Sequence, residues 1–408
     1  MAAALAAVSP LWPTAWSAAM TLAILGGIVP MIAAVNIRVV PVFTRRQWRS
    51  EQWLRVQNTL MVAGAWIVAA GWLWRLGSLV TLGSAVALAG GVAFVTNVAL
   101  LIRQPIGKMP ALPLPFPEQG PIDRVGTGFM RLSGIYLLFG LAVGLMRSVW
   151  TPPVGRWDLV WAHALLIGFF VSMAAGVSYH VLSRWTGAPW RWTRPIRWHL
   201  ELVRYGLPFM VLALATGWTP LFAVAGVVQA LALLIFVVNL VPMIPVLPEL
   251  TRPAFAAAAL LISIGVTLGA WFALDPAVGA RLRQAHAELN VFGFAGLLIS
   301  GTAFYLIPRF AGRPLRWPRL AATQLALLGG GVALTAVGWA WRGWAGGPLA
   351  IIAVGQALVV IGFVLFGAIM FGTFTRAGSG AVSAATIQSG KSVASRQPLP
   401  VHPAPPRA

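Results

Sequence analysis

Long apolar runs dominate this sequence and leave few alternatives for its fold. Each run has about the 20 predominantly apolar residues that an α-helix needs to cross the hydrocarbon core of a bilayer. The runs span residues 14–43, 58–77, 79–102, 129–149, 159–182, 202–219, 221–242, 254–274, 288–308, 318–341 and 348–372. The sequence therefore predicts an all-α integral membrane protein with about eleven transmembrane helices.

The composition excludes several other classes of protein. Of the 408 residues, 59% are apolar and only 9% are charged, whereas soluble proteins carry about 25% charged residues. The net charge of +21 is scattered between the apolar runs, whereas a nucleic-acid-binding domain gathers its cations on one face. We therefore expect the lipid bilayer, and no nucleic acid, as a partner. The sequence has no cysteine, so no thiolate can ligate a metal.

The positions of the cations predict the orientation of the chain. If the runs cross the membrane alternately, one side receives few cations, namely Arg75, Arg147, Arg156, Arg281, Arg283 and Arg342. Apart from Arg38, inside the first run, all other Lys and Arg residues fall on the opposite side. Cytoplasmic loops carry the excess of Lys and Arg. We therefore expect a multi-pass protein of the cytoplasmic (inner) membrane, with the N-terminus outside and the C-terminus in the cytoplasm.

A repeated segment is the most informative internal feature of the chain. Residues 180–192 resemble residues 305–317 at a constant offset of 125, which also joins four pairs of glycines further upstream. The matched pairs are Arg184 and Arg309, Gly187 and Gly312, Pro189 and Pro314, Arg191 and Arg316, Trp192 and Trp317, Gly140 and Gly265, Gly144 and Gly269, Gly168 and Gly293, and Gly176 and Gly301. A weaker third copy, residues 38–49, ends the first apolar run.

The repeats predict how the chain is organised. We expect a single transmembrane domain over residues 1–375, built from three parallel units at about 14–128, 129–253 and 254–375. Three units of four helices would make twelve helices, and the twelfth would lie ahead of residue 14, where no apolar run is found. Residues 376–408 are rich in Ser, Pro and Ala without periodicity, which predicts a disordered cytoplasmic tail.

Three parallel four-helix units resemble subunit I of the heme-copper oxidases, and short motifs strengthen the resemblance. These are residues 134–140, Ala162-His163-Ala164, residues 179–182, and residues 285–290 continuing to Pro308-Arg309-Phe310. Residues 38–45 are similar to a Gly-Arg-x-x-Pro-x-Phe-Thr-Arg motif of the NnrS family, with Ile37 in place of the glycine. That family is linked to nitric oxide stress and is reported to contain heme and copper.

The sequence departs from the oxidase pattern at the positions that hold the metals. The oxidases take a heme ligand from the helix that matches residues 14–43 and a His-His pair from the one that matches 202–219, and neither is present here. We therefore do not expect a complete binuclear site for oxygen or nitric oxide reduction. Whether the chain is an enzyme stays open.

Few ionisable residues lie at membrane depth, where such groups are costly and usually functional. His163 and His286 lie at the outer ends of equivalent helices, and the resemblance implies that they bind b-type heme or, as a second choice, copper. Glu288 is expected to bind a metal, support a ligand histidine or take up protons, unless it only favours a helix start. Arg184 and Arg309 are expected to face heme propionates or lipid phosphates.

Three further residues occupy the same place in the three repeats. Arg38, His180 and Tyr305 are expected to form a polar cluster at the inner surface, or to cap helices there. His199, in an Arg-rich stretch, and His402, in the tail, are expected to be solvated.

Two functions follow from these observations. The first is a heme protein with a role in respiration or nitric oxide handling, working with other respiratory subunits. The alternative is a cofactor-free transporter or assembly subunit on a degenerate oxidase scaffold, which the small number of histidines favours.

Overall fold

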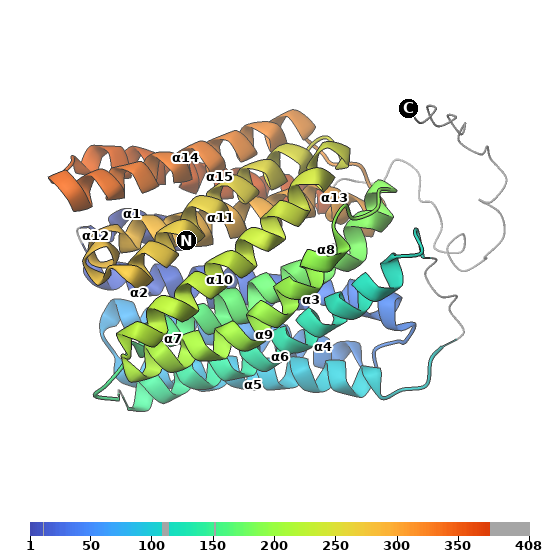
Figure 1. Cartoon of the computed structure of the whole chain (residues 1–408), viewed down its shortest axis with the longest axis horizontal. Helices are drawn as coiled ribbons and strands as arrows, with labels where there is room; N and C mark the ends of the chain where they lie inside the picture. The colour runs from blue at the N-terminus through green and yellow to red at the C-terminus, as the bar shows by residue number, and fades with distance from the viewer. Residues whose placement is uncertain (11, 108–113, 151, 376–408) are drawn as a thin grey trace.

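A computed structural model describes residues 1–10, 12–107, 114–150 and 152–375 of the chain. Within these residues the structure is all-helical, and the long helices run side by side along the longest axis of the molecule (Figure 1). Ten helical segments are long and apolar enough to cross a bilayer. The prediction of an all-α polytopic membrane protein is therefore confirmed, and the predicted tail at 376–408 lies outside the described residues.

The first half of the chain contributes five long helical segments. A short helix, α1 (Ala2–Val8), precedes them and packs against α2 and α15. The segments are α2 (Pro13–Thr21) continuing through η1 (Leu22–Ile28) and α3 (Val29–Thr44), α4 (Glu51–Trp74), α5 (Gly77–Ile102), α6 (Gln119–Val149), and α7 (Trp157–His163) continuing through η2 (Ala164–Val171) and α8 (Ser172–Thr186).

The second half contributes six more. They are α9 (Thr193–Thr216), α10 (Thr219–Leu240) with η3 (Val241–Val246), α11 (Thr251–Leu274), α12 (Pro276–Ala287) continuing through η4 (Glu288–Ala295) and α13 (Gly296–Ala311), α14 (Pro318–Ala345) and α15 (Leu349–Thr375). Each of the eleven predicted runs therefore corresponds to one helical segment, although the runs 58–77 and 202–219 extend past the ends of α4 and α9. Of these segments, α9 is the one whose apolar content falls short of a candidate span, because its first half carries Arg194, Arg197, Glu201 and Arg204.

Several helices begin earlier than their apolar runs. The helix predicted from residue 58 begins at Glu51, the one predicted from 129 begins at Gln119, and the one predicted from 202 begins at Thr193. Counting apolar residues finds only the part of a helix that lies in hydrocarbon. The polar turns that extend beyond it are invisible to that count.

Three π-helical stretches, η1, η2 and η4, occupy equivalent positions in the three units. The alignment that matches Arg38 with His180 and Tyr305 also matches Leu22 with Ala164 and Leu289, at or beside the start of each stretch. The stretch η1 contacts both η2 and η4. Such stretches are rare and often mark functional sites. Their shared position agrees with a threefold repeat, while the exact unit boundaries stay a prediction.

Candidate functional site

Two histidines from different units meet at one end of the bundle. His163 ends α7, just before η2, and His286 lies near the end of α12, just before η4. Their rings are nearly parallel, with centroids 6.5 Å apart and an interplanar angle of 28°. Both rings line a cavity of about 430 Å³ and a smaller one of about 90 Å³. The pair therefore forms a wall that the two cavities share.

The hydrogen bonds of the two rings fix their tautomers. His163 Nδ1 lies 2.8 Å from the carbonyl oxygen of Leu159, and His286 Nδ1 lies 2.8 Å from that of Gly265. A carbonyl oxygen can only accept, so each Nδ1 carries the proton and donates it. Each Nε2 then keeps its lone pair, the arrangement usual for a histidine that ligates a metal. Among the described residues neither Nε2 has a hydrogen-bond partner.

Two glycines of α11 make room for His286 and its neighbour. A Cβ at Gly269 would lie 2.9 Å from His286 Cε1, and one at Gly265 would lie 2.6 Å from the side-chain amide of Asn290. That amide donates to the carbonyl of His286 at 2.7 Å, which steadies this turn of the helix. The equivalent glycines of α6 are filled by Trp161 and Leu165 instead. The repeat therefore offers two matching niches, of which the second alone holds an imidazole.

The larger cavity is also lined by cationic side chains. It is bordered by Arg147 from the end of α6 and by Arg283 from α12, and also by the acidic side chain of Asp158 from α7. The Arg147 guanidinium lies 5.9 Å from the centre of the Trp161 ring. The volume of the larger cavity is within the usual range of small-molecule sites, about 300–1,000 Å³. The cavity therefore combines imidazoles, apolar walls and cations at one end of the bundle.

Glu288 does not join the histidine pair. Its side chain is fully buried and accepts a hydrogen bond from Gln356 Nε2 of α15 at 2.9 Å. Its other carboxyl oxygen has no partner in the described part of the chain. Nor do three metal-ligating side chains come together anywhere in those residues. The predicted ligand set of His163, His286 and Glu288 is thus split between two places.

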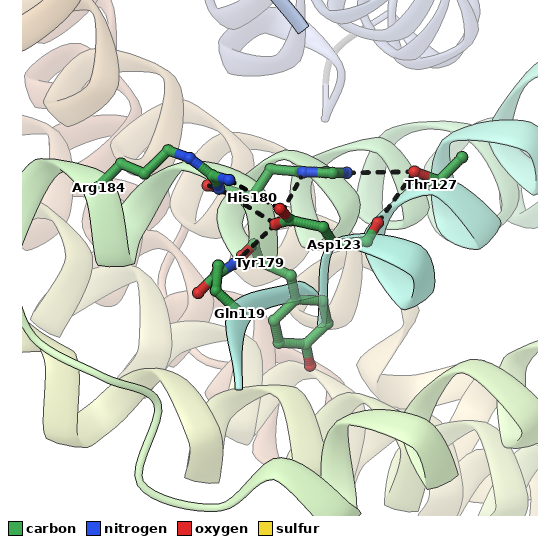
Figure 2. A network of polar contacts seen from close by, with 6 residues as sticks. All are labelled: Gln119, Asp123, Thr127, Tyr179, His180 and Arg184. Carbon is green, nitrogen blue, oxygen red and sulfur yellow. Dashed lines mark hydrogen bonds and ion pairs between the residues drawn. The ribbon is translucent and has the colours of Figure 1, made fainter. Parts of the chain in front are cut away.

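A second polar cluster lies at the opposite end of the bundle, around Asp123 of α6 (Figure 2). Arg184 binds both of its carboxyl oxygens, at 3.1 and 2.7 Å, and His180 Nδ1 lies 3.0 Å from one of them. Gln119 donates to the same oxygen at 2.7 Å, and Thr127 lies 3.3 Å from His180 Nε2. The cluster joins α6 to α8 through one carboxylate that is largely shielded from solvent.

The inner cluster predicted from the repeats has a different composition in the structure. No hydrogen bond in the described residues joins Arg38, His180 and Tyr305, and Arg38 is exposed. His180 pairs with Asp123, and the ring of Phe43 lies 5.2 Å from its own. The three positions are equivalent in sequence, but only the second unit supplies an acidic partner.

Neither predicted propionate ligand reaches the histidine pair. Arg184 follows His163 by 21 residues on a continuous helix, which places it roughly 30 Å away. Arg309 lies over the Tyr305 ring at 3.5 Å and donates to the Tyr305 carbonyl at 2.8 Å. Helical geometry thus separates both arginines from a cofactor on His163 or His286.

His199 was expected to be solvated, and that prediction is wrong. Its side chain is fully buried, its Nδ1 lies 2.9 Å from the Tyr179 hydroxyl, and its ring lies 4.5 Å from that of Phe129. The residues Ile196, Leu200, Val203 and Leu207 are also buried. The helical spacing of these apolar residues in the sequence indicates that His199 faces the protein interior.

Comparison with known proteins bears on the fold alone. No family model and no curated protein sequence matches the chain. Among solved structures, it is similar to a chain of a heme-copper terminal oxidase dimer determined by cryo-EM, with a TM-score of 0.59 and 14% sequence identity. The similarity covers 90% of this chain and 74% of the oxidase chain.

The chain has a heme-copper oxidase subunit I-like fold. This confirms the predicted oxidase-like fold, whereas the similarity to the NnrS family is not shown. The residues around the larger cavity include the kinds of groups that can hold a heme. They supply an imidazole nitrogen for iron, apolar walls for a porphyrin, and two arginines that suit carboxylates.

Proposed function

We propose that this membrane protein binds one b-type heme in the larger cavity, and that His163, His286 or both would hold its iron. The observation that carries the proposal is the pair of imidazoles whose free Nε2 atoms border a cavity of about 430 Å³. Arg147 and Arg283, on the rim of that cavity, would hold the propionates in place of Arg184 and Arg309. A bound heme would supply a one-electron redox centre.

The residues around the histidine pair would hold the two imidazole rings in position to bind iron. The carbonyl oxygens of Leu159 and Gly265 hold the rings in the tautomer that ligates iron, and Gly269 keeps the space beside His286 open. A role in respiration or in nitric oxide handling, beside other respiratory subunits, follows from a redox centre in the cytoplasmic membrane. Copper is a weaker fit, because the pair supplies only two of the ligands that a copper site needs.

The absorption spectrum of protein purified in detergent after heme-replete expression tests the proposal. We expect a Soret band, with its intensity strongly reduced in the double variant His163→Ala/His286→Ala. His402→Ala, in the tail, is the matched control and should keep the full band. Protein without a Soret band would contradict heme binding, and metal analysis of the same sample would detect copper.

A second function is favoured by one specific observation. The chain has five histidines, of which two line the described cavities. A cofactor-free transporter or assembly subunit on an oxidase-like scaffold would need no more. If the Soret band is absent, the next experiments would search for a co-purifying partner or a transported solute.

A further inference from the structure

Helices α9 and α10 lie side by side (Figure 1), and side chains of both line a groove between them. It has a volume of about 650 Å³ and is almost wholly apolar. Small residues, Gly206 and Ala225, form part of its lining, between the large side chains of Tyr205, Phe209 and Val224. Val224 is 64% exposed and Phe209 is 53% exposed. The exposure of these side chains indicates that the groove faces the lipid.

Contacts with neighbouring helices set the depth of the groove in the membrane. A Cβ at Gly128 of α6 would lie 2.7 Å from Leu200 of α9, so these two residues share one level. The hydrocarbon part of α6, predicted from residue 129, begins at that level. Trp198, which borders the groove and is 65% exposed, is thus placed at the interface that tryptophan prefers. The groove runs from there toward Phe209, about 12–16 Å deeper.

The mouth of the groove is cationic. Glu201 borders it and is neutralised by Arg204, whose Nη1 lies 3.3 Å from both carboxyl oxygens. Arg197 lies one helical turn before Glu201, and Arg194 lies one turn further out. Both are exposed, and neither forms an ion pair within the part of the chain that the structure describes. Two uncompensated positive charges therefore remain where a lipid headgroup would lie.

We propose that this groove is a specific site for one anionic phospholipid. An acyl chain occupies the apolar slot, and the phosphate group lies against Arg194 and Arg197. Charge complementarity at the mouth selects an anionic headgroup over a zwitterionic one, since a cation near the surface contributes about a fivefold preference. The site is independent of the histidine pair, which lies at the other end of the bundle.

The lack of cysteine makes a direct test practicable. Leu231→Cys, on the exposed face of α10 beside the groove, takes a single environment-sensitive fluorophore. The labelled protein is placed in vesicles with equal amounts of phosphatidylglycerol and phosphatidylcholine, with bromine on the acyl chains of one lipid or the other. Val354→Cys on α15, which is 54% exposed to lipid and distant in sequence from the groove, is the matched control.

We expect brominated phosphatidylglycerol to quench the label at Leu231→Cys several-fold more efficiently than brominated phosphatidylcholine, with no preference at Val354→Cys. Arg194→Gln and Arg197→Gln should each reduce this preference, and the double variant Arg194→Gln/Arg197→Gln should be quenched equally by the two lipids. Both arginines are exposed, so these variants should elute from a sizing column as the parent does. Equal quenching by the two lipids at Leu231→Cys, or the same preference at both sites, would overturn the proposal.

Discussion

Asp123 shows how a single acidic residue can be kept in a helix that enters the membrane. Its carboxylate accepts a bidentate pair of hydrogen bonds from Arg184 and a third bond from Gln119, and it lies 3.0 Å from His180. A carboxylate that is largely shielded from water would be costly without such partners. The cluster therefore stabilises the Asp123 carboxylate and acts as a clamp that holds α6 and α8 together.

Replacing Asp123 with Asn should destabilise the protein by about 2–3 kcal/mol, because Arg184 and His180 would keep their places without an anion. This change is measured as the difference in the free energy of unfolding when the detergent-solubilised proteins are titrated reversibly with a denaturant. Glu51→Gln is the control, since its ion pair with Arg55 is almost fully exposed and contributes at most about 1 kcal/mol. Equal effects of the two substitutions would show that the Asp123 cluster is not a clamp.

At the scale of elements, close contact between α11 and α12 determines where His286 lies. Gly269 and Gly330 are both helical glycines, but only the first is crowded. A Cβ at Gly269 would lie 2.9 Å from His286 Cε1, whereas one at Gly330 would meet nothing within 4 Å. Comparing alanine substitutions at Gly269 and Gly330 therefore separates the effect of a glycine on helix stability from its effect on the position of His286.

Gly330→Ala should stabilise the protein by about 0.5–1 kcal/mol, because alanine favours a helix. Gly269→Ala should instead cost about 1–3 kcal/mol through overpacking, and it should also weaken heme binding by displacing His286. Thermal unfolding and heme content of the two variants measure both effects. If Gly269→Ala were as benign as Gly330→Ala, the niche beside His286 would not matter.

The elements also show what could be predicted from the sequence. The helices and the threefold pattern were predictable because hydropathy and repeated glycines are local features of the chain. The partners of His199 and His180 were not, because Tyr179 and Asp123 reach them only through packing between helices. Glu288 was grouped with His286 because they are close in sequence, yet its side chain turns to Gln356 on another helix.

At the scale of the whole molecule, the fold places two different chemistries at opposite ends of one bundle. The histidine pair and its cavity lie at one end, and the arginine-rich turns, the Asp123 cluster and the mouth of the lipid groove lie at the other. The excess of cations predicts that the second end faces the cytoplasm. A heme on the histidine pair would then lie near the outer face.

Single cysteines test this orientation. A membrane-impermeant maleimide added to intact spheroplasts should label Arg75→Cys, between α4 and α5, and should spare Arg103→Cys, at the end of α5. Lysed membranes should show labelling of both, which controls for reactivity. The opposite pattern in intact spheroplasts would invert the topology and place the histidine pair on the cytoplasmic side.

A hemin titration of the purified, heme-depleted protein, followed by absorbance, tests whether His163 and His286 bind heme. We expect saturation at one heme per chain with growth of a Soret band, a marked loss of affinity in the double variant His163→Ala/His286→Ala, and no loss in His402→Ala. Binding that does not saturate, or that is unchanged when both His163 and His286 are replaced, would contradict this expectation.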